Sequence, residues 1–180
     1  MPSPVPAEAQ PEQLLADAYR EHFNHVWHTL RRLGVASRDL EDAAQEVFII
    51  AHRRLPDFDP SRPIRPWLSG IVWRVASDER KRARNRREMV GIKAEPVAQY
   101  GGPQRDLEAA EARRLVHRAL GELPDAQRIV FIMHEIDGFS MPEIEASLQV
   151  TLNTLYSRLR LARRKFKAAV KQLQGDGGSP

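Results

Sequence analysis

The chain has 180 residues, 42 % of them hydrophobic, and a formal charge of +4 with a pI near 9.7. This composition excludes a wholly disordered chain and allows one moderate hydrophobic core or two small ones. The absence of cysteine excludes disulfides, thiolate zinc sites and cysteine nucleophiles. The start, MPSPVPAEAQPEQ, does not have the pattern of a secretory signal, and no stretch is apolar enough to span a membrane, so we expect a cytoplasmic protein.

Apolar side chains at helical spacing predict three helices in the first half of the chain. The first covers about residues 12 to 33 and ends at Gly34; the second runs from Leu40 to Leu55. A proline-rich loop follows at 57–66, and a third helix starts near Pro66 and continues into the basic run at 80–87. Trp67 lies on the apolar stripe of this third helix and is expected in the core.

Glycine, proline and polar residues replace this pattern at 89–106, which indicates a flexible linker. Helical spacing resumes at Leu107, breaks at LPDAQ, and returns from Ile129 to Ile136. The expected fold is all-α, with small helical domains at 13–88 and 107–172 and disordered tails at 1–12 and 173–180. Signals for β-strands are nearly absent.

The segment SMPEIEASL at 140–148 carries a capping box, in which Ser140 and Glu143 satisfy each other's backbone N–H groups. The helix that starts there has only about two turns. The residues QVT then form a short turn before Thr151 caps a longer basic helix. A short helix, a tight turn and a longer helix form the helix-turn-helix pattern.

The longer helix buries one stripe and leaves a basic face outside. Leu155, Leu159 and Ala162 lie on the buried stripe, and residues 152–173 contain no aspartate or glutamate. Asn, Ser and Arg near the start of such a helix can match base edges in a major groove, while later cations suit phosphates. DNA contact is therefore favoured over a plain solvated face or a membrane-surface helix.

The second helix has the opposite character on its exposed side. With Val47 at the centre of the buried face, acidic and polar side chains at 41, 42 and 45 lie opposite it, and Ile49 lies among them. An exposed isoleucine among acids suggests a protein partner, although a solvated acidic face is the alternative.

Several segments in a fixed order resemble the bacterial RNA polymerase sigma factors of the extracytoplasmic function (ECF) group of the sigma-70 family. They are DLEDAAQEVFIIAHRRL (39–55), PWLSGIVWRVASDERKR (66–82), and LPDAQRIVFIMHEIDGFSMPEIEASL followed by TLNTLYSRLRLARRKF. The resemblance covers about residues 13–172. It implies a sigma region 2-like bundle, and a region 4-like helix-turn-helix domain that binds the duplex −35 promoter element.

In this family the second helix docks on the clamp helices of the largest subunit of core polymerase, and the third reads the single-stranded −10 element. The polymerase-binding residues expected here are Asp39, Glu41, Asp42, Gln45 and Glu46, with Ile49 added from the helical wheel. Those expected at the −10 element are Trp73, Arg74, Arg80, Lys81, Arg82 and Arg84, and the loop 57–66 is expected to form the pocket for a flipped-out base. Those expected at the −35 element are Asn153, Thr154, Ser157, Arg158, Arg160, Arg163 and Arg164.

The resemblance implies an alternative sigma factor that binds core polymerase, directs promoter-specific initiation and is held by an anti-sigma factor. Arg74 stands where the family often has Asn, and Leu161 replaces a residue that is often basic, so promoter sequence does not transfer from relatives. The alternative function is a helix-turn-helix regulator that binds duplex DNA without polymerase. Neither catalysis nor a cofactor is expected, and no metal site either, because His28 diverges from His22 and His25 on the first helix.

Overall fold

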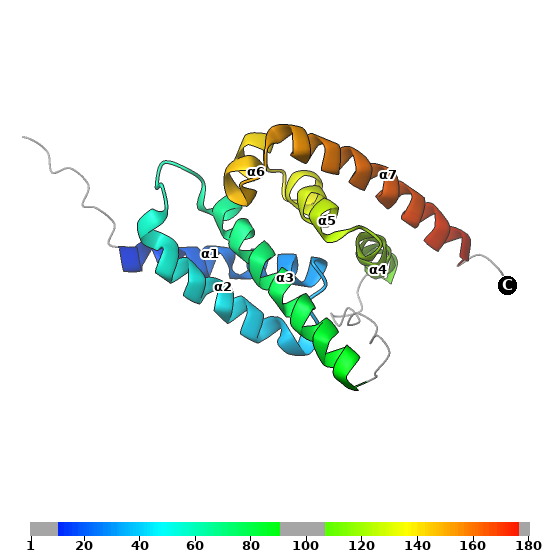
Figure 1. Cartoon of the computed structure of the whole chain (residues 1–180), viewed down its shortest axis with the longest axis horizontal. Coiled ribbons are helices and arrows are strands. Elements are labelled where there is room, and N and C mark those ends of the chain that lie inside the picture. The colour runs from blue at the N-terminus through cyan, green and yellow to red at the C-terminus, as the bar shows by residue number, and fades with distance from the viewer. Residues whose placement is uncertain (1–10, 91–106, 177–180) are drawn as a thin grey trace, which may run out of the picture.

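The structure, a computed structural model, describes residues 11–90 and 107–176 (Figure 1). These residues form helices and no strand, which confirms the all-α prediction. The first half contains α1 (Pro11–Arg32), α2 (Leu40–Arg54) and α3 (Ile64–Val90), with 3-10 turns at Ser37–Asp39 and Leu55–Asp57 on either side of α2. The second half contains α4 (Leu107–Gly121), α5 (Asp125–Phe131), α6 (Met141–Leu148) and α7 (Leu152–Asp176), and a π-helical segment at Ile132–Ile136 follows α5.

Helix ends differ from the predictions by a few residues. The helix α7 continues to Asp176, into the segment expected as a tail, because no proline interrupts its amphipathic pattern and Leu173 is still half-buried. The helix α1 similarly begins at Pro11, and α3 continues through Met89 and Val90. The other residues of the expected tails and linker lie outside the described ranges, so the domain boundaries remain predictions.

The first three helices pack as a bundle in the lower half of Figure 1. Leu30 from α1, Val47 from α2 and Leu68 from α3 are completely buried, as the apolar stripes predicted. Gly34 ends α1 with a positive φ of 90°, and the N–H groups of Gly34 and Val35 donate to the carbonyls of Arg31 and Leu30. This Schellman motif favours glycine because a side chain at such a φ is strained.

The second group of helices packs directly on the first, and one hydrophobic core runs through both. Figure 1 shows α6 beside the beginning of α3 and α7 along the outer edge of the molecule. The Ser147 hydroxyl in α6 donates to the carbonyl oxygen of Pro66 in α3 at 2.6 Å. The two predicted helical domains therefore pack together around a shared hydrophobic core.

Candidate functional site

The acidic side of α2 is exposed as predicted. Ala43, Ala44 and Val47 are buried and fix the orientation of the helix, so Glu41, Asp42, Gln45 and Ile49 point outward. The Ile49 side chain is 51 % exposed. An aliphatic side chain of this exposure beside carboxylates is a typical feature of a protein-binding surface.

Two of the predicted polymerase-binding acids differ from the others, because they pair with cations of α3. Asp39 is half-buried and lies 3.6 Å from the Arg86 guanidinium. Glu46 lies 3.6 Å from Arg82, which also bonds to Glu79. These contacts link the acidic helix to the basic helix next to it.

The cations predicted at the −10 element lie along α3, and more carboxylates accompany them than the sequence suggested. Arg82 bonds to Glu79, and this bond together with the carboxylate charges raises the pKa of the arginine. Lys81 lies 3.6 Å from Asp78. Arg74 and Arg84 are exposed, whereas Arg80 is half-buried and pairs with Asp125 of α5.

Trp73, a residue expected at the −10 element, is half-buried and packs against the core. It lines a groove of about 490 Å³ between α3 and the start of α5. Arg74, Lys81 and Arg84 form the basic side of this groove, and Asp125 lies at the other side. An indole beside three cations is suited to contact a nucleotide and its phosphates.

The proline-rich loop forms one wall of a larger cleft, of about 640 Å³. Asp59 organises the loop because its carboxylate accepts from the Ser61 N–H at 3.0 Å and from the Ser61 hydroxyl at 2.6 Å, which lowers its pKa. The rings of Phe58 and Trp67 lie 4.9 Å apart at the base of the loop. Trp67 is half-buried against the core, so it both supports the bundle and lines the cleft.

The helix-turn-helix pattern is confirmed in the order of its helices, in its short turn and in its capping box. Ser140 accepts from the Glu143 N–H, and the Glu143 carboxylate accepts from the Ser140 N–H, which completes the predicted capping box. Gln149 ends α6 with φ 56°, in the left-handed region. The Glu145 carboxylate accepts from the Leu152 N–H at 3.0 Å and so connects the two helices across the turn.

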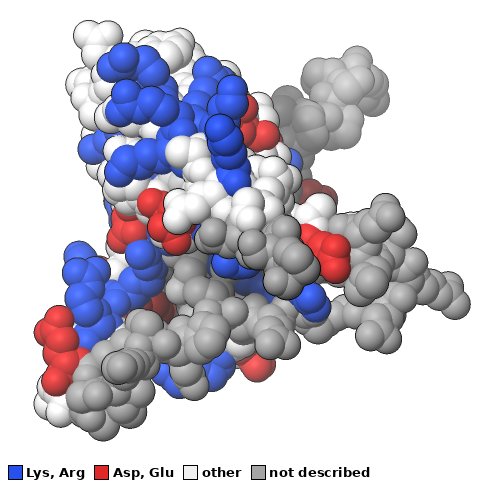
Figure 2. All heavy atoms as spheres, turned by 90° about the vertical axis from the view of Figure 1, so that its right-hand side faces the viewer, with Lys and Arg blue, Asp and Glu red and all other residues white. Residues whose placement is uncertain are grey.

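The far side of α7 is the basic surface that the helical wheel predicted. Leu155, Leu159 and Ala162 are buried, and Tyr156 is 57 % exposed on the opposite side. Arg163 differs from its neighbours because its Nε donates to Glu135 at 2.8 Å. Figure 2 shows Lys and Arg gathered in the upper part of the molecule, at the height of α7 in Figure 1. The exposed candidates on this helix are Asn153, Thr154, Ser157, Arg160, Arg163 and Arg164, and Arg158 is half-buried.

Known proteins share both halves of this fold. The family description "Sigma-70 region 2" matches residues 18–86, and "Sigma-70, region 4" matches residues 113–166. The RNA polymerase sigma factor NccH of Alcaligenes xylosoxydans xylosoxydans is 30 % identical over 159 residues, which cover 86 % of each chain. The ECF RNA polymerase sigma-E factor of Escherichia coli K12 is 30 % identical over 161 residues, 84 % of each chain. The chain belongs to the ECF group of sigma-70 factors.

Solved sigma factors have the same fold. CnrH, in complex with the cytosolic domain of CnrY, is similar with a TM-score of 0.62 and 25 % identity over 93 % of this chain and 91 % of CnrH. RpoE from Bartonella quintana, in complex with the anti-sigma factor NepR, has a TM-score of 0.72 and 22 % identity over 88 % of this chain and 98 % of RpoE. ECF sigma factors act in transcription initiation rather than as enzymes. Among the described helices of this sigma factor, none is long and apolar enough to cross a membrane.

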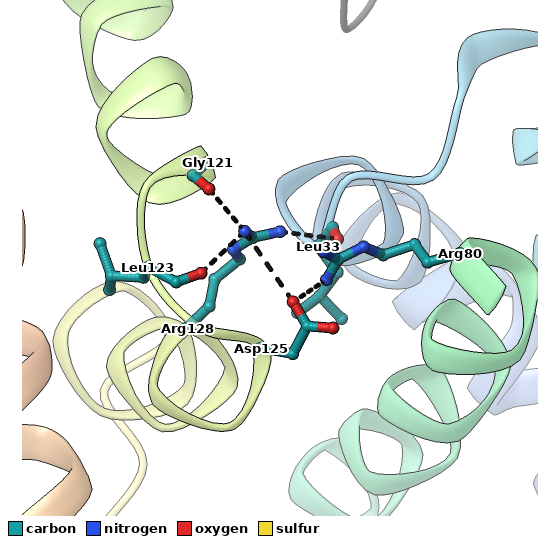
Figure 3. A network of polar contacts seen from close by, with 6 residues as sticks. All are labelled: Leu33, Arg80, Gly121, Leu123, Asp125 and Arg128. Atoms are coloured by element: carbon teal, nitrogen blue, oxygen red, sulfur yellow. Dashed lines mark hydrogen bonds and ion pairs between the residues drawn. The ribbon is translucent and has the colours of Figure 1, made fainter. Parts of the chain in front are cut away.

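Residues that sequence reasoning missed connect region 2 to region 4 in this sigma factor. Arg128 of α5 is 5 % exposed, and its guanidinium donates to the carbonyl oxygens of Leu33 at 3.1 Å, Gly121 at 2.8 Å and Leu123 at 2.9 Å (Figure 3). Leu33 belongs to region 2, directly after the end of α1. Burial lowers the pKa of Arg128 to about 10, and the charge of Arg80 adds to this effect.

A second buried contact joins the two regions along the C-terminal half of α1. The Asp137 side chain is 2 % exposed and lies 3.5 Å from Arg32 and 3.9 Å from His25. Burial raises the pKa of Asp137 to about 6, against the opposing charges of Arg32 and Arg65.

Burial and the cationic neighbours Arg65 and Arg32 lower the pKa of His25 to about 4, and the nearby rings of His22 and His28 act in the same direction. Ser69 donates to the carbonyl of Arg65, so its hydroxyl oxygen accepts from His25 Nε2 at 2.9 Å. The neutral His25 ring therefore carries its proton on Nε2.

Proposed function

We propose that this ECF sigma factor binds core RNA polymerase through the acidic side of α2 and directs it to promoters. In this proposal α7 reads the duplex −35 element, while α3 and the loop 57–66 hold the melted −10 strand. One observation carries the proposal: α7 presents exposed polar and basic residues outward from a helix-turn-helix without a single acidic residue between 152 and 173. A DNA duplex is the partner that such a surface fits.

The α2 surface supports the polymerase part of the proposal. Glu41 and Asp42 are exposed beside Ile49, and neither carboxylate forms an ion pair with another residue of 11–90 or 107–176. Charge reversal at Glu41 or Asp42 therefore breaks no ion pair within the described helices, whereas charge reversal at Glu46 would break its pairing with Arg82. Glu41 and Asp42 are therefore the sharper positions for a test.

The test compares Asp42→Lys with Glu111→Lys, an exposed acid of α4, as the matched control. We expect Asp42→Lys to lose most of its association with core polymerase in co-purification and its core-dependent transcript in vitro, while Glu111→Lys behaves as the wild type. Circular dichroism checks that both variants keep their helical content. Full association of a folded Asp42→Lys protein with core enzyme would contradict the proposal.

On α7, the first turns are assigned to bases and the later cations to phosphates. Asn153 and Ser157 lie near the start of the helix, where side chains enter a major groove, and Arg160 lies one turn further on. Lys167 is exposed beyond them. Substituting a phosphate-binding cation should weaken binding to all promoters about equally, whereas substituting Asn153 should change which base is preferred in the −35 element.

On α3, the indole of Trp73 and the exposed cations Arg74 and Arg84 are assigned to the −10 strand. The cleft beside Phe58 and Trp67 is assigned to a flipped-out base, because aromatic rings can stack on a base of any sequence. The proposed role as a sigma factor also implies a cytoplasmic location and an anti-sigma factor as a further partner. The resemblance to CnrH and RpoE, which were solved with CnrY and with an anti-sigma factor, supports the second of these.

A further inference from the structure

A carboxylate from outside α7 is bonded to the basic surface of that helix. The Nε of Arg163 donates to Glu135 Oε1 at 2.8 Å, and its Nη2 donates to the same oxygen. Among the side chains that the structure describes, no other cation of α7 forms an ion pair with a carboxylate. The surface that we assign to the −35 element therefore contains one arginine that is held by an acid, among others that extend into solvent.

The backbone around Glu135 has an unusual conformation that fixes its position. Glu135 lies in the π-helical segment Ile132–Ile136, which follows α5 without a break. The Asp137 N–H closes this segment by donating to the carbonyl oxygen of Ile132 at 2.9 Å. Single π-helical turns are rare and occur frequently at functional sites.

The packing of α5 against α7 brings the acid and the arginine together. The two helices lie side by side (Figure 1), and the rings of Phe131 and Phe166 stack between them with centroids 4.6 Å apart. Phe166 lies one turn after Arg163 on α7, and Phe131 is buried. The distance between Glu135 and Arg163 is therefore set by the core of region 4.

Folding stability does not account for this ion pair. The side chains of Arg163 and Glu135 are 56 % and 33 % exposed, and exposed ion pairs contribute little to stability. A carboxylate on a DNA-binding surface also repels phosphates, which weakens binding. The geometry of the two hydrogen bonds offers a role that can offset this repulsion.

The guanidinium group can bond to two partners at once, because its N–H groups lie on a rigid planar fork. Glu135 accepts from the edge formed by Nε and Nη2. The N–H groups at the end of the fork, on Nη1 and Nη2, have the spacing that suits two oxygens of one phosphate. An arginine held in this way loses less conformational freedom when it binds DNA than an arginine on a free side chain.

We propose that Glu135 is a positioning residue for −35 recognition, which holds the Arg163 guanidinium so that its outer N–H groups meet one phosphate of the duplex. This inference rests on the proposed function and adds to it a residue outside α7. Arg163 lies beyond Asn153 and Ser157 along the helix, among the later cations that we assign to phosphates rather than bases. The contact therefore strengthens binding to every promoter and selects no base.

Three variants of the full chain, each in complex with core RNA polymerase, test this role. Glu135→Ala removes the carboxylate, Arg163→Ala removes the guanidinium, and the third variant combines both substitutions. Glu111→Ala is the matched control, because it removes an equal charge from an exposed position on α4 of the same region. The DNA is a duplex promoter selected by the wild-type complex from a randomised library, and urea unfolding checks that each variant is folded.

Glu135→Ala should bind this promoter about five-fold more weakly than the wild type, although it removes a charge that repels DNA. Because one phosphate contact is lost, the slope of log K against log salt should become about 0.9 less steep. Arg163→Ala should show the same two changes, and the double variant should bind no more weakly than Arg163→Ala. Glu111→Ala should bind as the wild type does.

Equal or tighter promoter binding by Glu135→Ala would overturn the inference, because the carboxylate would then act on DNA only by repulsion. The inference would equally be overturned if the losses of Glu135→Ala and Arg163→Ala added up in the double variant, since the two residues would then act independently. A changed choice of bases by Glu135→Ala would refute the phosphate assignment.

The wild-type complex separates these outcomes from failure of the proposed function. If the wild type with active core selects promoters and Glu135→Ala binds them equally well, only the positioning role is refuted. If the wild type with active core selects no promoter, the proposed function fails, and the inference that rests on it fails too.

Discussion

Replacing Arg128 by methionine tests whether the buried guanidinium holds the two regions together. Methionine keeps a long flexible side chain but donates no hydrogen bond, so three carbonyl oxygens lose their donor. Hydrogen bonds from a charged group contribute about 1.5 to 3 kcal/mol each, so the gross loss is about 6 kcal/mol. Against this, burial lowers the pKa of Arg128 to about 10, which corresponds to a relief of about 3 kcal/mol when the charge is removed. The expected net loss is about 3 kcal/mol in the free energy of unfolding.

The assay is urea denaturation of the full chain followed by circular dichroism, with Arg163→Met as the control. Arg163 also pairs with a carboxylate, Glu135, but its side chain is 56 % exposed, so its loss should cost at most about 1 kcal/mol. Because Arg128 bonds to Leu33 across the interface, its variant should also unfold in two steps where the wild type unfolds in one. A loss below about 1 kcal/mol for Arg128→Met, with one unchanged transition, would refute this account of the interface.

The remaining predictions concern pH, the helix-turn-helix turn and salt. As pH falls from 6.5 to 4, the protein loses stability through His25, because the His25 ring takes up a proton more readily in the unfolded chain than in the folded one. It gains stability through Asp137, because the Asp137 carboxyl takes up a proton more readily in the folded chain. Each effect is about 3 kcal/mol in the free energy of unfolding. Relative to the wild type, Asp137→Asn should therefore lose stability to urea as pH falls from 6.5 to 4, and His25→Gln should gain it; parallel pH profiles for all three proteins would contradict the pairing. Gln149→Gly should stabilise the chain by about 0.5 to 1 kcal/mol in thermal unfolding, since φ 56° suits glycine, and a lower melting temperature would show that the Gln149 side chain matters more than the strain. Promoter affinity of the complete polymerase should fall steeply with salt, and Lys167→Ala should reduce the slope by about 1 in a plot of log K against log salt, whereas an unchanged slope would remove Lys167 from the phosphate contacts.

Much of the helical structure could be predicted because the spacing of apolar residues along each helix identifies the side that is buried. The stripe around Val47 predicted the exposed acids of α2, and the stripe through Leu155 and Leu159 predicted the outer face of α7. The Ser140 and Glu143 capping box is a local motif, so its contacts depend only on residues three apart. Such features need no knowledge of the rest of the fold.

Contacts between the two regions could not be predicted from the same patterns. A helical wheel identifies an apolar side but not the element that covers it, so the seating of α6 on α3 was missed. Gly70 was the available signal, because a glycine inside an otherwise regular helix often marks a close approach. Arg128 and Asp137 gave no signal, since charged residues near a turn are usually solvated and only the structure shows their burial.

Selection of active promoters from a randomised library, by core RNA polymerase carrying the wild type or one of two variants, measures the central claim most directly. We expect Arg160→Ala to change the selected bases only in the upstream element and Trp73→Ala only in the downstream element, with core association equal for all three proteins. The claim that two surfaces on two regions grip one promoter would be contradicted if both variants selected the same promoters as the wild type. It would equally be contradicted if the wild-type chain bound specific duplex sites as tightly without core enzyme as with it.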